Sequence, residues 1–166
     1  MKKLIVAAAA LALAVPLVRG LRSPSSSESA DEVASAANRL LVDRVWIDHV
    51  PHSDTDTIQV FAALSDQALG VFQAASQWRG STELFRFEAH GAELRILYPQ
   101  TGERETVRAK ARRCEERGMD YCLELDGASR GVKRYYSRKG WEIGRGTELP
   151  AVVRRVEVLR TQLVAP

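Results

Sequence analysis

Two of the chain's three histidines lie in a short acidic segment, residues 48–56, which reads Asp-His-Val-Pro-His-Ser-Asp-Thr-Asp. Imidazole nitrogens and carboxylate oxygens are ligands that zinc and other divalent ions accept. The spacing of His49 and His52 matches no common ligand motif, however, and Pro51 with the Ser-Asp pair that follows it is typical of a turn. We therefore predict a polar turn between two strands, and no metal site.

Catalytic signatures are missing from the rest of the sequence. It contains no G-x-S-x-G, no phosphate-binding glycine loop and no H-E-x-x-H. None of the histidines stands beside an obvious nucleophile, and the carboxylates show no spacing that would pair two of them in a buried site. We predict a protein that is not an enzyme and needs no cofactor.

The two cysteines, Cys114 and Cys122, are too far apart for a C-x-x-C redox motif. Each lies on the polar side of a segment in which apolar and polar residues alternate. When the cysteines are placed opposite one another, oppositely charged residues also face each other across the two strands (Arg112 with Glu124, Lys110 with Asp126). This register predicts a disulfide that closes the hairpin.

Residues 130–141 interleave cations with aromatic rings. Such a surface suits an anionic glycan, a lipid headgroup or an acidic protein. The same pattern also suits the last strand of a sheet, with long cationic side chains beside rings that fill the core. The candidate partner-binding residues are Lys133, Arg134, Tyr135, Tyr136, Arg138, Lys139 and Trp141.

Strands are the elements that must position most of these residues. From residue 43 onward the apolar residues recur with a period of two, and short turns rich in glycine, proline and aspartate separate the runs. Strands are predicted over residues 43–50, 57–64, 68–77, 82–89, 93–98, 105–114, 120–126 and 132–138. This spacing favours a mainly β fold, an eight-stranded antiparallel meander closed into a barrel, with an α+β roll around a curved antiparallel sheet as the alternative.

A helix is predicted at each end of this domain. Ser29 and Glu32 have capping-box spacing before a helical apolar pattern, which predicts a short helix over residues 30–41. Near the C-terminus, Pro150 suits the first turn of a helix. In that helix one apolar stripe would comprise Leu149, Val152, Val156, Leu159 and Leu163, and the residues outside it would be Arg154, Arg155, Glu157 and Arg160.

The interior of the predicted barrel is the candidate ligand site. We expect it to be lined by Phe85, Phe87, Tyr98 and Trp78, together with Ile58, Val60, Ala62 and Leu64, which share one side of a strand. The small inward residues Ala109 and Ala111 leave room either for a ligand or for neighbouring rings.

The N-terminus resembles an export signal. Two lysines precede the apolar run Leu4–Val15, which is shorter than the roughly 20 residues a membrane span needs. We predict a signal peptide over residues 1–20 with cleavage after Gly20, or alternatively after Ala14. A flexible linker over residues 21–28 and a single domain over residues 29–166 would follow. The location is then periplasmic or extracellular, with membrane contact only through the signal segment.

Cleavage changes the charge of the chain. The whole sequence has 24 Lys and Arg against 21 Asp and Glu, and removing Lys2, Lys3 and Arg19 leaves 21 against 21. A nucleic-acid partner is therefore not expected. Charge is nevertheless uneven, since residues 28–77 are acidic and residues 101–145 are basic.

The order of a helix, eight strands and a terminal helix over residues 43–163 resembles the calycin group of lipocalin-like barrels. The segment from Cys122 to Tyr136 is similar to uncharacterised exported bacterial proteins. These resemblances imply a non-catalytic binding protein of the cell envelope that holds a small apolar ligand or docks a partner. The alternative is a structural subunit of an envelope assembly, such as a motility or secretion complex, with no ligand.

Overall fold

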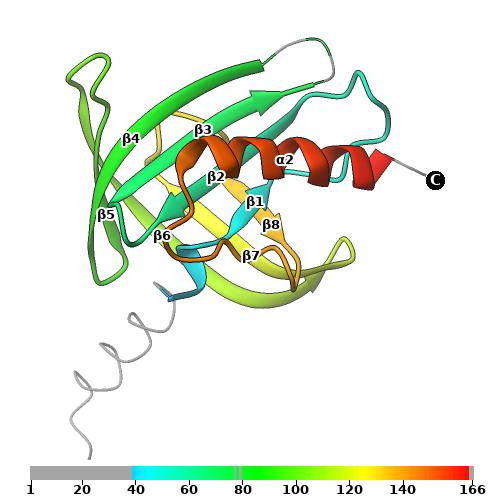
Figure 1. Cartoon of the computed structure of the whole chain (residues 1–166). Coiled ribbons are helices and arrows are strands. Elements are labelled where there is room, and N and C mark those ends of the chain that lie inside the picture. Colours follow the sequence, from blue (N-terminus) through cyan, green and yellow to red (C-terminus); the bar gives the residue numbers. More distant parts are fainter. Residues whose placement is uncertain (1–38, 77, 79, 165–166) are drawn as a thin grey trace, which may run out of the picture.

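The structure is a computed structural model that describes residues 39–76, 78 and 80–164. Within this part of the chain each strand runs antiparallel to the next, and the last pairs with the first to close a barrel (Figure 1). The strands are β1 (Val45–Ile47), β2 (Ile58–Leu64), β3 (Leu69–Ala75), β4 (Gly80–His90), β5 (Glu93–Leu97), β6 (Arg104–Glu116), β7 (Met119–Asp126) and β8 (Arg134–Ser137). The helix α2 (Leu149–Val164) then lies across the outside of the barrel.

All eight predicted strands are present, and their closure confirms the barrel rather than the curved-sheet roll. β1 is shorter than the predicted run 43–50. Asp43 has a left-handed backbone with a φ of 56°, and the Asp48 side chain accepts a hydrogen bond from the backbone amide of Gln59. Residues 39–41 are helical. The rest of the predicted N-terminal helix, the linker and the signal segment lie outside the described residues.

Aromatic rings fill the inside of the barrel. Phe61, Phe72, Phe85, Tyr98 and Tyr135 are buried there, and neighbouring ring centroids lie 5.0–6.4 Å apart. The backbone makes room for them at Gly70, where a Cβ atom would lie 2.2 Å from the Phe85 ring. At this level the interior has no space for even one methyl group.

A second core lies between the barrel and α2. Val152 and Val156 pack over the outward-facing residues of β1, β2 and β3, so that both faces of these strands are buried. The expectation that Ile58, Val60, Ala62 and Leu64 line the interior is wrong, because they belong to this outer core. Phe61 and Ala63 point inward instead. A strand that is apolar on both faces gives no alternation from which its inner face can be recognised.

The apolar stripe predicted for α2 is confirmed, with Val152 and Val156 buried and the three leucines partly buried. Arg160 is a correction, because this residue, expected outside the stripe, is only 9% exposed. The turn after β1 lies against the C-terminal half of the helix, where Arg160 Nη1 is 3.5 Å from the carbonyl oxygen of Asp54. The long side chain is covered by that turn.

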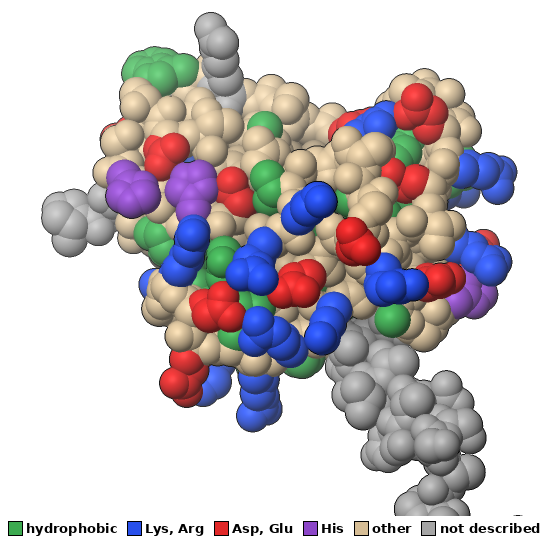
Figure 2. Space-filling model, turned by 180° about the vertical axis from the view of Figure 1, so that it is seen from behind, with side chains coloured by type: hydrophobic (Ala, Val, Ile, Leu, Met, Phe, Trp, Pro, Cys, Tyr) green, Lys and Arg blue, Asp and Glu red, His purple; other side chains and the backbone are tan. Residues whose placement is uncertain are grey.

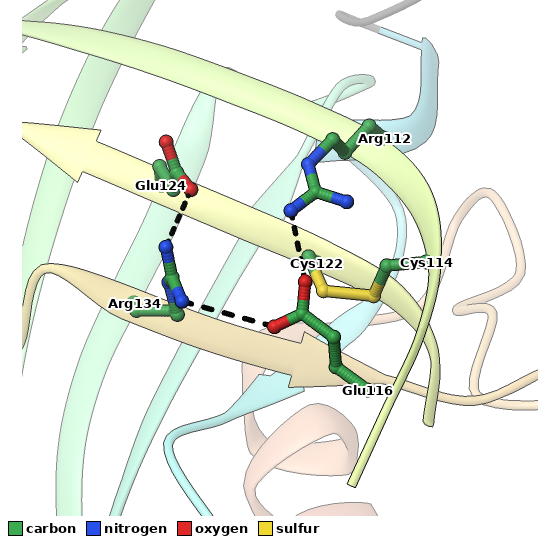
Figure 3. Close-up of a disulfide and its surroundings, with 6 residues drawn as sticks. All are labelled: Arg112, Cys114, Glu116, Cys122, Glu124 and Arg134. Atoms are coloured by element: carbon green, nitrogen blue, oxygen red, sulfur yellow. Dashed lines mark hydrogen bonds and ion pairs between the residues drawn. A yellow bond between two sulfur atoms is a disulfide. The ribbon is translucent and has the colours of Figure 1, made fainter. Parts of the chain in front are cut away.

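The disulfide predicted between Cys114 and Cys122 is confirmed, with the two Cα atoms 5.8 Å apart (Figure 3). Cys122 lies on the outward side of β7, as expected, but is fully buried in the outer core.

The predicted register of this hairpin is wrong by two residues. Arg112, not Cys114, lies opposite Cys122; the other facing pairs are Lys110 with Glu124 and Arg108 with Asp126. Arg117 and Gly118 both have positive φ, which forms a tight two-residue turn and places Glu116 opposite Met119. A bulge between Arg113 and Glu116 then shifts the ladder and brings the sulfur atoms together.

Gly70→Ala tests whether the interior is packed as described. We expect a loss of about 1–3 kcal/mol in the free energy of unfolding, because the added methyl group forces the Phe85 ring out of place. Gly80→Ala is the matched control on the neighbouring strand, since among the described residues its Cβ would meet only the Ala74 backbone oxygen, at 3.9 Å. Urea unfolding of both variants measures the difference, and equal stabilities would contradict a filled interior.

Replacing both cysteines by alanine tests the contribution of the disulfide. A loop closed over a sequence separation of 8 residues should stabilise the fold by about 2–3 kcal/mol through the unfolded state. Urea unfolding of the wild-type protein with and without a reductant should show a loss of this size, and the double variant should be insensitive to the reductant. A wild-type protein equally insensitive to reduction would count against the bond.

Candidate functional site

The structure places three of the four predicted ligand-lining residues inside the barrel. Phe85 is fully buried, Tyr98 lies 6.4 Å from it between ring centroids, and Phe87 lies 6.1 Å from it. These rings contact one another rather than a common empty space. Trp78 is not part of this group, because it lies in the connection between β3 and β4 and is 74% exposed.

Arg130 closes one end of the barrel. Its guanidinium lies 4.5 Å above the ring of Tyr98. Its Nε donates to both carboxylate oxygens of Glu83 at 3.1 Å, and its Nη2 donates to Glu103. A pocket of about 420 Å³ lies beside it, lined in part by Phe72, Glu83 and Arg130. The charges at this end are therefore paired among themselves.

Tyr98 and Glu105 form the buried half of this network. The Tyr98 hydroxyl donates to Glu105, whose second oxygen accepts from the backbone amide of Ser129 at 2.9 Å. Burial, and then the carboxylate beside it, raise the pKa of Tyr98 far above its ordinary value. Burial also acts to raise the pKa of Glu105, but the hydrogen bonds from Tyr98 and Ser129 and the charge of Arg130 outweigh it and hold that pKa low. At neutral pH the Tyr98 phenol is therefore neutral and the Glu105 carboxylate is ionised. This pairing suits a structural role at this end of the barrel.

The histidine segment forms a turn at the same end of the barrel. His49 Nδ1 lies 2.9 Å from Asp48, and its Nε2 lies 3.2 Å from Asp56. The backbone amide of His52 also donates to Asp56, and this bond is the largest of the effects that lower the pKa of that carboxyl. The side chains thus bond within the turn, as ordinary turn chemistry requires.

Cys114, Glu116 and Cys122 are the group of described residues whose ligand-type atoms lie close enough together to hold a metal ion. The two sulfur atoms are bonded to each other, so they are not free to bind a metal while the disulfide is intact.

The basic and aromatic segment does not form one surface. Its rings are core: Tyr135 lies in the interior, and Tyr136 and Trp141 lie in the outer core. Three of its cations are paired. Arg134 pairs with Glu124 and Glu116 (Figure 3). Lys139 pairs with Asp120, and Arg130 pairs with Glu83 and Glu103. Lys133 is exposed, and Arg138 contributes its backbone oxygen to a bond with Arg44. The arrangement is the one expected of a last strand with rings in the core.

A groove on the outer face of the barrel is the feature that the sequence did not reveal. It crosses β3 to β6, has a volume of about 1010 Å³, and is lined by residues that include Leu69, Arg86, Arg95, Leu97, Arg104 and Thr106. We call it the β3–β6 groove. The helix α2 packs over β1, β2 and Val71 of β3, and the face turned away from it carries many charged side chains (Figure 2).

The three arginines of the β3–β6 groove are exposed, and none of them is within 4.0 Å of a carboxylate in the described part of the chain. Two glutamates line the groove: Glu88 lies 3.5 Å from His90, and Glu105 accepts a hydrogen bond from Tyr98. Strand alternation alone predicts that Arg104 points outward. The meeting of the three arginines depends on cross-strand register, which the local pattern does not contain.

Comparison with known proteins finds no family model that matches the chain, and no similar curated protein or solved structure.

Tyr98→Phe tests the network at the Arg130 end. Because the pKa of Glu105 is lower in the folded protein, its ionised form stabilises the fold above the ordinary value of 4.5, and this contribution is lost as the pH falls. Without the phenol hydroxyl, the free energy of unfolding of the variant should be lower by about 1 kcal/mol at neutral pH and by less at acidic pH.

Tyr135→Phe is the control for this measurement. The Tyr135 hydroxyl accepts a bond from the backbone amide of Val132 and donates to no carboxylate in the described residues. Loss of this hydroxyl should lower the free energy of unfolding by the same amount at every pH. Urea unfolding over a pH series separates the two variants, and a loss in Tyr98→Phe that did not change with pH would contradict the assignment.

Proposed function

We propose that this protein is a non-catalytic binding protein of the cell envelope that docks a partner on the outer face of its barrel. The observation that carries this proposal is the contrast between the two sides of the sheet. The interior is filled by rings that leave no space at Gly70, whereas the β3–β6 groove is open, and its three arginines have no carboxylate within 4.0 Å among the described residues.

Export is part of the same proposal. The support is the basic and then apolar pattern of residues 1–20, together with the disulfide, since such bonds persist in oxidising compartments. Among the described residues, no helix is both long and apolar enough to cross a membrane.

A carrier of an apolar ligand inside the barrel was the other form of this function expected from the sequence. Eight strands enclose an interior that side chains can just fill, and here Phe61, Phe72 and Phe85 are in mutual ring contact. This packing favours docking on the surface. A structural subunit of an envelope assembly remains the second candidate, and it too would use an outer surface.

Site-specific photo-cross-linking in cells of the natural source tests the proposal. A photoreactive residue at position 106 replaces Thr106 in the groove, and the control replaces Val158, which is 56% exposed on α2. We expect a discrete adduct from position 106 and none from position 158. Adducts from neither position, or equally from both, would refute docking at the groove. A stoichiometric apolar ligand found by native mass spectrometry would establish the carrier instead.

A further inference from the structure

The register of four strands sets leucines and arginines alternately across the β3–β6 groove. Leu69 pairs with Arg86, Arg86 with Leu97, and Leu97 with Arg104, in one row across the strands. Successive strands are about 4.8 Å apart, so the backbones of the two arginines are separated by roughly 10 Å with a leucine between them. Arg95 stands in the next row, beside Glu88 and Thr106.

We propose that the β3–β6 groove binds an acidic peptide segment of a partner protein, with two carboxylates about 10 Å apart on either side of an apolar side chain. This inference rests on the proposed function and names the chemistry of the partner. Arg86 and Arg104 each form paired hydrogen bonds to a carboxylate, which the planar guanidinium group is suited to make. Leu97 contacts the apolar side chain between them.

The two leucines support an amphipathic partner rather than a simple anion. Both are only partly buried, and neither belongs to the barrel core or to the outer core. Arginine is enriched in protein interfaces, where apolar contact adds to charge complementarity. A free phosphate would satisfy the arginines and leave the leucines exposed to water.

A flat anionic membrane fits this surface less well than a narrow segment does. Carboxylates stand beside the cations along the same strands: Arg95 faces Glu88, and Arg108 faces both Glu93 and Asp126. A plane of negative headgroups would be brought against these carboxylates together with the arginines. A single peptide chain lying along the groove can contact the cations and avoid these carboxylates.

The test uses the full-length protein and a short fluorescent peptide that carries a leucine between two glutamates, spaced so that their carboxylates can lie about 10 Å apart. Fluorescence anisotropy should show binding that weakens as salt is raised. The variant R86E/R104E should bind about tenfold more weakly. The control R145E/R154E changes the net charge equally at two exposed arginines outside the groove, and it should bind as the wild type does.

Three results would overturn the proposal. These are equal binding of a peptide with glutamines in place of the glutamates, equal weakening in both double variants, and binding to phosphatidylglycerol vesicles without binding to the peptide. Failure of the acidic-segment proposal can be distinguished from failure of the proposed function. An adduct from position 106 in cells with no peptide binding refutes the acidic segment and leaves surface docking standing, whereas loss of both refutes both.

Discussion

β1 and β8 meet at one pair of residues in register, Ile47 and Tyr136, and on this short contact the closure of the barrel depends. So few backbone bonds give little stability alone. Buried Arg44 strengthens the seam, because its guanidinium donates to the Arg138 carbonyl at 2.8 Å and lies 4.0 Å above the Tyr121 ring. Segment 141–143 lengthens it through backbone bonds to residues 43 and 45. Side chains and the segment that follows β8 therefore add to the few backbone bonds between β1 and β8 in closing the barrel.

Closure at this seam decides where each face of the sheet is used. The chain leaves the seam through residues 141–148 and enters α2, which covers the outer face of β1, β2 and β3. In the described part of the chain no helix covers the opposite wall, from β4 to β6, which keeps its alternation of charged and buried residues. Aromatic side chains fill the interior, and α2 covers one outer wall. The groove thus occupies the part of the surface that the fold itself does not use.

The sequence predicted the strands well because their signal is local. Periodicity and turn residues located all eight strands and the α2 stripe, and the two cysteines were paired correctly although the register used to pair them was wrong. The errors concern relations between segments. The inner face of β2 was misassigned because both of its faces are apolar. The register of β6 and β7 was misjudged because the turn at Arg117 and the bulge after Arg113 set it. Arg86 and Arg104 are far apart in sequence, and only the folded sheet brings them to one groove.

The attachment of α2 is unequal along its length. Just before the helix, the Gly146 amide donates to Asp66, and the Thr147 carbonyl accepts from Gln67, which fixes its N-terminal end to the β2–β3 hairpin. Toward the C-terminus, the Nε of buried Arg160 has no hydrogen-bond partner among the described residues, and its Nη1 reaches the turn through long contacts with Asp54, 3.5 Å to the carbonyl oxygen and 4.0 Å to the carboxylate. Local opening begins where bonds are fewest. The helix therefore unzips from its last turns toward its first, so native-state hydrogen exchange would follow a gradient along α2 while the barrel beneath stays protected.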